Sequence, residues 1–119
     1  MISMKDKTEK KQNISCEGID FQVDNEGYLT NPDDWNEFVA SAIAKKEGEK
    51  ELKSEMLEIL YFIRDYYKMK KMFPSLTLVA KSLNKSTGSV LRMFGSHAKA
   101  WKIAGLPQPK DELSFLLGL

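Results

Sequence analysis

Side chains that could act as nucleophiles or soft metal ligands are scarce in this chain, which has one cysteine, Cys16, and one histidine, His97, among its 119 residues. A single cysteine excludes an internal disulfide and a cysteine-based zinc site. The sequence has no Gly-rich phosphate-binding loop, no cluster of metal ligands and no nucleophile paired with His97. We therefore predict no catalytic residue, no metal and no cofactor, and we interpret Cys16 as an incidental thiol.

Basic side chains offer a second kind of chemistry, the binding of phosphates. Residues 17–58 carry twelve acids and four bases, whereas residues 64–110 carry ten bases and one acid, Asp65. Within the basic segment, residues 76–94 have the spacing of a helix-turn-helix, the DNA-binding motif whose second helix enters the major groove. The residues that would contact bases or phosphates are Lys81, Lys85, Ser86, Thr87, Ser89, Arg92, Lys99 and Lys102.

Two observations oppose a role in DNA binding. Lys85 occupies a position of the motif that an aliphatic residue usually fills, and helix pairs with a tight turn are common in bundles that bind no DNA. The segregated charges also have a second explanation, in which two oppositely charged halves of the fold attract each other. The sequence leaves both explanations open. For Asp65 it favours an ion pair with Arg64 over a catalytic role.

Hydrophobic periodicity and helix caps predict the elements that would position these side chains. Alternating apolar residues predict a strand over 19–23 that returns over 28–30 through a turn at 24–27. Apolar stripes predict helices over residues 31–47, 54–73, 75–83, 87–94 and 96–104. The first helix would begin at the cap Asn31 and bury Phe38, while the second, capped by Ser54, would be the central helix of a bundle.

The predicted fold class is mainly α (α+β): a small helical bundle with a helix-turn-helix, an N-terminal β-hairpin and a C-terminal arm. We expect residues 1–16 to be a disordered basic leader, residues 17–105 to be one domain and residues 106–119 to be the arm. No apolar run approaches the roughly 20 residues of a membrane span and no secretory signal is present, so we expect a cytoplasmic protein with no membrane partner. The apolar arm residues, which could anchor a protein partner, fold back or mediate self-association, are Leu113, Phe115, Leu116 and Leu117.

Several motifs, taken in order, resemble the DsrC/TusE family. They are Glu26-Gly27-Tyr28-Leu29, Asp34-Trp35, Phe62-Ile63-Arg64-Asp65-Tyr66-Tyr67, Pro74 and Lys102-Ile103-Ala104-Gly105-Leu106-Pro107-Gln108-Pro109. The family includes the gamma subunit of dissimilatory sulfite reductase and the TusE sulfur-relay protein. The resemblance runs from about Ile19 to Pro109 and implies a helical bundle with a β-hairpin and a mobile C-terminal arm.

The resemblance also implies where sulfur chemistry would take place, and both positions have lost their thiol. The nearly terminal cysteine of the family arm corresponds to Glu112, and a second cysteine that some members use to close a disulfide with the arm corresponds to Trp101. A carboxylate cannot attack a persulfide as a thiolate does. Trp101 would either complete the core or fill the groove in which a family arm docks. A family insertion near Asn84 is absent as well.

These observations favour a non-catalytic accessory or regulatory protein of sulfur metabolism. It would bind a protein partner, which the resemblance implies to be a sulfite reductase or a sulfur-relay component, or DNA, or both. One alternative is a sulfur-relay protein that uses Cys16 or a cysteine of its partner. A further alternative is a relative that occupies the family's partner and blocks it.

Overall fold

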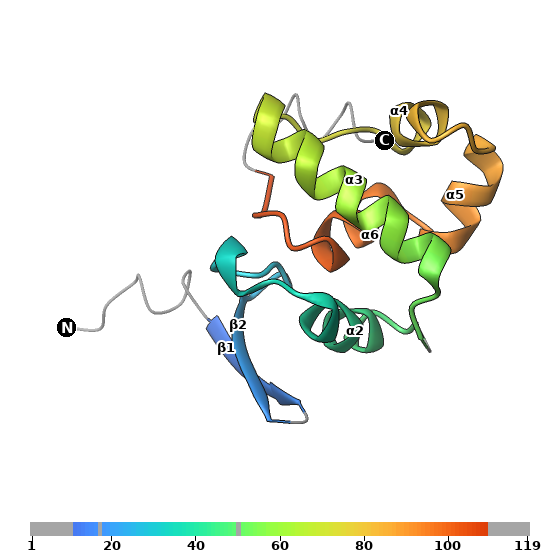
Figure 1. Cartoon of the computed structure of the whole chain (residues 1–119). Helices are drawn as coiled ribbons and strands as arrows, with labels where there is room; N and C mark the ends of the chain where they lie inside the picture. Colours follow the sequence, from blue (N-terminus) through green and yellow to red (C-terminus); the bar gives the residue numbers. More distant parts are fainter. Residues whose placement is uncertain (1–10, 17, 50, 110–119) are drawn as a thin grey trace.

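The computed structural model of the chain describes residues 11–16, 18–49 and 51–109. A two-stranded antiparallel sheet is followed by a short 3-10 helix and five α-helices, and this confirms the mainly helical α+β fold (Figure 1). The elements are β1 (Lys11–Cys16), β2 (Ile19–Asp24), η1 (Pro32–Asp34), α2 (Glu37–Lys46), α3 (Ser54–Lys70), α4 (Leu76–Ser82), α5 (Thr87–Phe94) and α6 (His97–Ile103). In the part of the chain that the structure describes, no helix is both long and apolar enough to cross a membrane.

The β-hairpin uses a different partner strand from the one that the sequence predicts. β2 pairs with β1 in a register that places Lys11 opposite Asp24 and Cys16 opposite Ile19. The expected return strand over 28–30 contributes a single bridge, between Leu29 and Val23. The prediction of disorder is therefore wrong for residues 11–16. Hydrogen bonds to a preformed strand can order a polar segment that has little hydrophobic pattern of its own.

The turn that follows β2 is formed as predicted. The Asp24 carboxylate accepts hydrogen bonds from the backbone N–H groups of Glu26 and Tyr28, both at 2.9 Å. Gly27 has a φ of +95°, in the left-handed region that glycine tolerates without steric cost. The turn brings Tyr28 and Leu29 into the core, where they are 5% and 2% exposed.

The segment after the turn forms two helices instead of the single helix that the sequence predicts. Asn31 caps η1 by accepting a hydrogen bond from the N–H of Asp33, and Asn36 caps α2 by accepting one from the N–H of Val39. Trp35 lies between them in an extended conformation. Because the helix restarts at Asn36, its buried face shifts away from Phe38, which is 65% exposed instead of buried.

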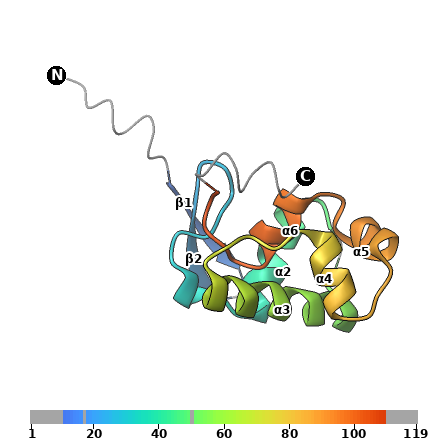
Figure 2. The same ribbon diagram turned by 90° about the horizontal axis from the view of Figure 1, so that it is seen from above.

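The central helix is α6 and not α3. α6 lies between α2 and α3 in Figure 1 and between the hairpin and α5 in Figure 2, and it contacts α2, α3 and α5. α3 instead buries one stripe, made of Met56, Ile59, Leu60 and Ile63. Its N-cap is Lys53 without a side-chain hydrogen bond, so the predicted cap at Ser54 is also wrong.

Candidate functional site

The candidate site is the segment where the C-terminal arm leaves the body, which we call the arm root (residues 102–109). α6 ends at Ile103, and Gly105 follows with a φ of +78°. The N–H of Gly105 donates to the carbonyl oxygen of Lys102 at 3.0 Å, and the N–H of Leu106 donates to that of Trp101 at 3.1 Å. This pair of bonds is the Schellman arrangement that closes a helix at a glycine. It fixes the direction in which the chain leaves α6.

Two side chains from distant elements hold the arm root in place, and we call them the arm-root clamp (Trp35 and Arg64). Trp35 Nε1 donates a hydrogen bond of 2.8 Å to the carbonyl oxygen of Ile103. Arg64 Nη1 donates one of 2.9 Å to the carbonyl oxygen of Ala104, and its Nη2 donates to that of Pro32 at 3.2 Å. The guanidinium lies 4.4 Å from the centre of the Trp35 ring, within cation–π range. The clamp therefore joins η1, α3 and the end of α6.

The clamp shows the structural role of Arg64, which the sequence alone did not reveal. Partial burial lowers the pKa of Arg64 from its usual value, but a guanidinium stays charged at neutral pH. Its N–H groups are directed to backbone carbonyls, and among the described residues it forms no ion pair with Asp65. The predicted Arg64–Asp65 pair is therefore wrong. Trp35 and Ile103 are 68 positions apart, so no local sequence pattern could have predicted their contact.

Gly105 is required by the clamp as well as by its own backbone. A Cβ atom added at this position would lie 2.8 Å from Arg64 Nη1 and still closer to the ring of Trp35. Neither neighbour can move away without losing its hydrogen bond to the arm root. Gly105 is consequently the position at which the arm root and the clamp pack most tightly.

A groove with a volume of about 220 Å³ opens beside the clamp. Three of its lining side chains are cations. Arg64 and Lys68 lie one turn apart on α3, and Lys71 is the residue that caps the C-terminus of α3. Its one acid is Asp33. The remaining lining residues are Pro32, Tyr67, Gly105, Leu106 and Pro107.

Trp101, which the resemblance matches to a family cysteine, is part of the core. It is 1% exposed, its Nε1 donates a hydrogen bond of 2.9 Å to the carbonyl oxygen of Pro74, and its ring lies 5.0 Å from that of Phe73. Of the two interpretations of Trp101, packing in the core is confirmed. Its neighbour His97 is partly buried, and this lowers the pKa of the imidazole and favours its neutral form. Among the described residues, no group of three or more His, Cys, Asp or Glu could hold a metal ion.

The predicted arm residues Glu112, Leu113, Phe115, Leu116 and Leu117 lie outside the described residues. Cys16 ends β1, and its backbone pairs with Ile19 across the hairpin. The end of β1 and the start of β2 lie at the end of the sheet away from the arm root (Figure 1).

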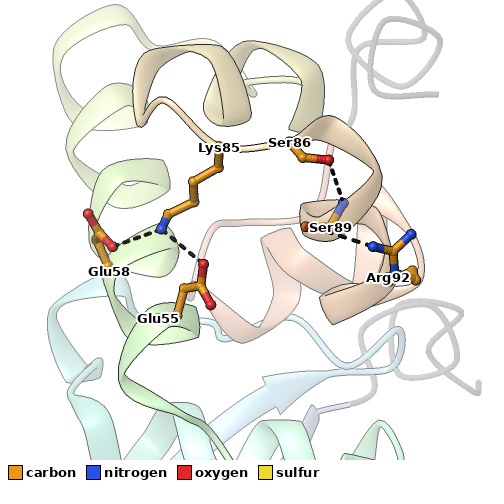
Figure 3. Close-up of polar contacts among 6 residues, drawn as sticks. All are labelled: Glu55, Glu58, Lys85, Ser86, Ser89 and Arg92. Atoms are coloured by element: carbon orange, nitrogen blue, oxygen red, sulfur yellow. Dashed lines mark hydrogen bonds and ion pairs between the residues drawn. The ribbon is translucent and has the colours of Figure 1, made fainter.

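The helix-turn-helix segment uses several of its predicted DNA contacts for its own structure. Figure 3 shows Lys85 directed toward α3, where its Nζ lies 3.0 Å from Glu55 and 3.3 Å from Glu58. Ser86 caps α5 by accepting a hydrogen bond from the N–H of Ser89, whose hydroxyl accepts one from Arg92 at 3.4 Å. The prediction that Lys85 contacts phosphate does not fit this geometry, because the pair holds its ammonium against the body.

The other predicted phosphate contacts give a similar result. Lys99 Nζ lies 2.8 Å from Glu49, and Lys102 Nζ lies 3.5 Å from Glu47. Lys81 is exposed near the end of α4, and Thr87 is the first residue of α5. The ion pairs among the described residues all join the basic segment 64–110 to the acidic segment 17–58. They support the explanation in which the two halves of the fold attract each other.

Both the sequence and the fold are similar to those of known proteins. Residues 15–112 match the family model described as DsrC like protein. The chain is 32% identical over 105 residues to the sulfurtransferase TusE homolog of Haemophilus influenzae, covering 81% of this chain and 95% of that protein. Its fold is similar to the NMR structure of Allochromatium vinosum DsrC, with a TM-score of 0.72, 30% identity and coverage of 85% of this chain and 97% of that one. It is also similar to a chain in the crystal structure of dissimilatory sulfite reductase I, with a TM-score of 0.74, 26% identity and coverage of 84% and 98%.

Proposed function

The chain belongs to the DsrC/TusE family, and we propose that it serves sulfur relay or sulfite reduction by binding a protein partner without carrying sulfur on its arm. The partner would be a sulfur-relay component or a sulfite reductase, as the names of its relatives suggest. The arm root and its clamp would present the C-terminal arm to that partner. The reacting thiol would then belong to another protein.

One observation supports this proposal: side chains of the body hold the arm root, although Trp101 and Glu112 stand where the resemblance places the family's thiols. Trp35 and Arg64 hold the carbonyls of Ile103 and Ala104, so the arm leaves the body in a fixed direction. Position 112 is Glu and position 101 is a buried Trp, and neither can form a persulfide or a disulfide. A chain that keeps the arm root and its clamp but has no thiol on the arm is suited to binding a protein partner.

A second candidate function is sulfur transfer through Cys16. It is favoured by the name of the Haemophilus influenzae relative, a sulfurtransferase homolog, and by Cys16 being the one cysteine of the chain. Its position at the end of β1, away from the arm root, makes it the weaker candidate. DNA binding has less support than either, because Lys85, Lys99 and Lys102 are engaged with carboxylates.

The test offers a persulfide donor to the purified chain and measures its intact mass. Sulfur transfer predicts a gain of about 32 Da that is lost in Cys16→Ser, because persulfide formation needs a thiolate. The proposed binding role predicts no gain in mass. It also predicts that the tagged wild-type chain and Cys16→Ser capture the same protein from nuclease-treated extracts of its own cells.

The identity of the captured protein decides between the outcomes. A sulfite reductase or a persulfide-carrying relay protein, held equally by both chains, supports the proposal. A stable sulfur adduct on Cys16, together with loss of the partner in Cys16→Ser, would replace it with the relay function. Capture of DNA alone from untreated extracts would contradict both.

A further inference from the structure

The lysines that line the groove beside the clamp differ from three other lysines of the basic segment because they form no ion pair among the described residues. Lys85, Lys99 and Lys102 each pair with a glutamate, as described above. Within the described residues, Lys68 and Lys71 form no ion pair, and both are exposed on the rim of the groove. With Arg64 below them and Asp33 as the one acid of the lining, the groove has an excess of positive charge. It therefore favours a negatively charged ligand.

The chain itself carries a suitable ligand close to this groove. Leu106 and Pro107 line the groove, so the arm begins at its wall. Asp111 and Glu112 are the first acids after Pro107. Asp111 lies four positions after Pro107, and an extended chain of four residues reaches at most about 13–14 Å. Two carboxylates are thus tethered within reach of two ammonium groups.

We propose that the groove is a carboxylate-binding site whose occupant is the chain's own arm, with Asp111 and Glu112 on Lys68 and Lys71. The carboxylates take the exposed side of the groove, because the clamp already uses two of Arg64's N–H groups on backbone carbonyls. A short tether keeps the local concentration of the ligand in the millimolar range, which lets individually weak ion pairs hold a segment in place. The site concerns the isolated chain and does not depend on the proposed function.

The experiment measures the distance between the arm and α3 by paramagnetic relaxation. A nitroxide is attached to the full-length chain at Ser114→Cys in a Cys16→Ser background, and amide signals are compared before and after reduction of the label. At low salt we expect strong broadening of the amides near Lys68 and Lys71. The broadening should weaken at 1 M salt, where the screening length falls to about 3 Å from about 10 Å at 0.1 M.

Charge-reversal variants distinguish binding of the arm through ion pairs from proximity that results only from its short link to the body. Asp111→Lys with Glu112→Lys should reduce the broadening severalfold, and so should Lys68→Glu with Lys71→Glu. The combination of all four substitutions should restore it. The matched control, Glu26→Lys with Glu51→Lys, changes net charge equally at exposed positions and should leave the broadening unchanged.

Two results would overturn the proposal. One is broadening near Lys68 and Lys71 that is the same in the arm reversal and in its control, since tethering alone would then account for it. The other is broadening centred on a different surface, which would mean that contacts of the arm's apolar residues, and not its carboxylates, determine where the arm binds. Amide spectra of each variant without the label report whether the fold is intact.

Discussion

Substitution of Gly105 by alanine tests the clamp most directly. The added Cβ meets two obstacles, a backbone with a φ of +78° and the side chains of Trp35 and Arg64. We expect the variant to be considerably less stable than the wild type. We also expect the arm root to lose the hydrogen bonds that fix its direction.

The magnitude follows from three contributions. The left-handed conformation costs a non-glycine residue roughly 1–2 kcal/mol. Displacing Trp35 forfeits a neutral hydrogen bond worth about 1 kcal/mol, and displacing Arg64 forfeits a charged one worth about 1.5–3 kcal/mol. The free energy of unfolding should therefore fall by roughly 3–6 kcal/mol, a large part of the 5–15 kcal/mol typical of a domain.

The chain provides its own control for this experiment. Gly95 also follows a helix with a positive φ, +86°, but a Cβ added there would have no atom within 4 Å. Gly95→Ala should therefore carry a conformational cost without the loss of a side-chain contact. Urea unfolding followed by circular dichroism measures both variants. If Gly105→Ala were no less stable than Gly95→Ala, the clamp would not constrain the arm root and our reasoning would be refuted.

Three further perturbations test other parts of the structure. Trp101→Cys should lower the free energy of unfolding by about 3–5 kcal/mol in urea, because it empties core volume and leaves the Pro74 carbonyl without its donor. Lys85→Met should change it little, because the carboxylate partners of Lys85 are half exposed, whereas Lys85→Glu should destabilise more at low salt than at high salt. Burial raises the pKa of Tyr28 from 10.0 to about 12, so the folded state binds this proton more tightly, and stability present below pH 10 should be lost as pH rises toward 12. Urea unfolding across this pH range measures the loss, which should be smaller in Tyr28→Phe.

Local chemistry made part of the fold predictable from sequence. Ser75 and Ser96, at the starts of two predicted helices, each accept a hydrogen bond from the backbone N–H three residues later. Ser86, which was predicted to contact DNA, caps α5 in the same way. Gly105 ends α6 as the last helix was predicted to end. Each of these interactions involves residues within one helical turn, so its information is contained in a few consecutive positions.

The parts that sequence did not predict depend on residues far apart in the chain. Trp35 reaches Ile103 across 68 positions, and Arg64 reaches Ala104 across 40. Lys85, which was predicted to contact phosphate, instead forms an internal ion pair with Glu55, 30 positions away in the sequence. The strand β1 was missed for a related reason. Its polar residues become a strand only because β2 supplies the hydrogen bonds.

The resemblance places the family's two thiols at positions 101 and 112, where this chain has Trp101 and Glu112, and this changes how the arm could be held to the body. A disulfide between positions 101 and 112 would be a covalent latch that responds to thiols. Here Trp101 is bonded to Pro74 within the core, so its side chain is unavailable to the arm. What remains beside the arm root is a groove rimmed by Lys68 and Lys71, and the residue at the family's thiol position is an acid. A latch made from these groups would respond to salt and to a competing acidic partner, and reducing agents would leave it unchanged.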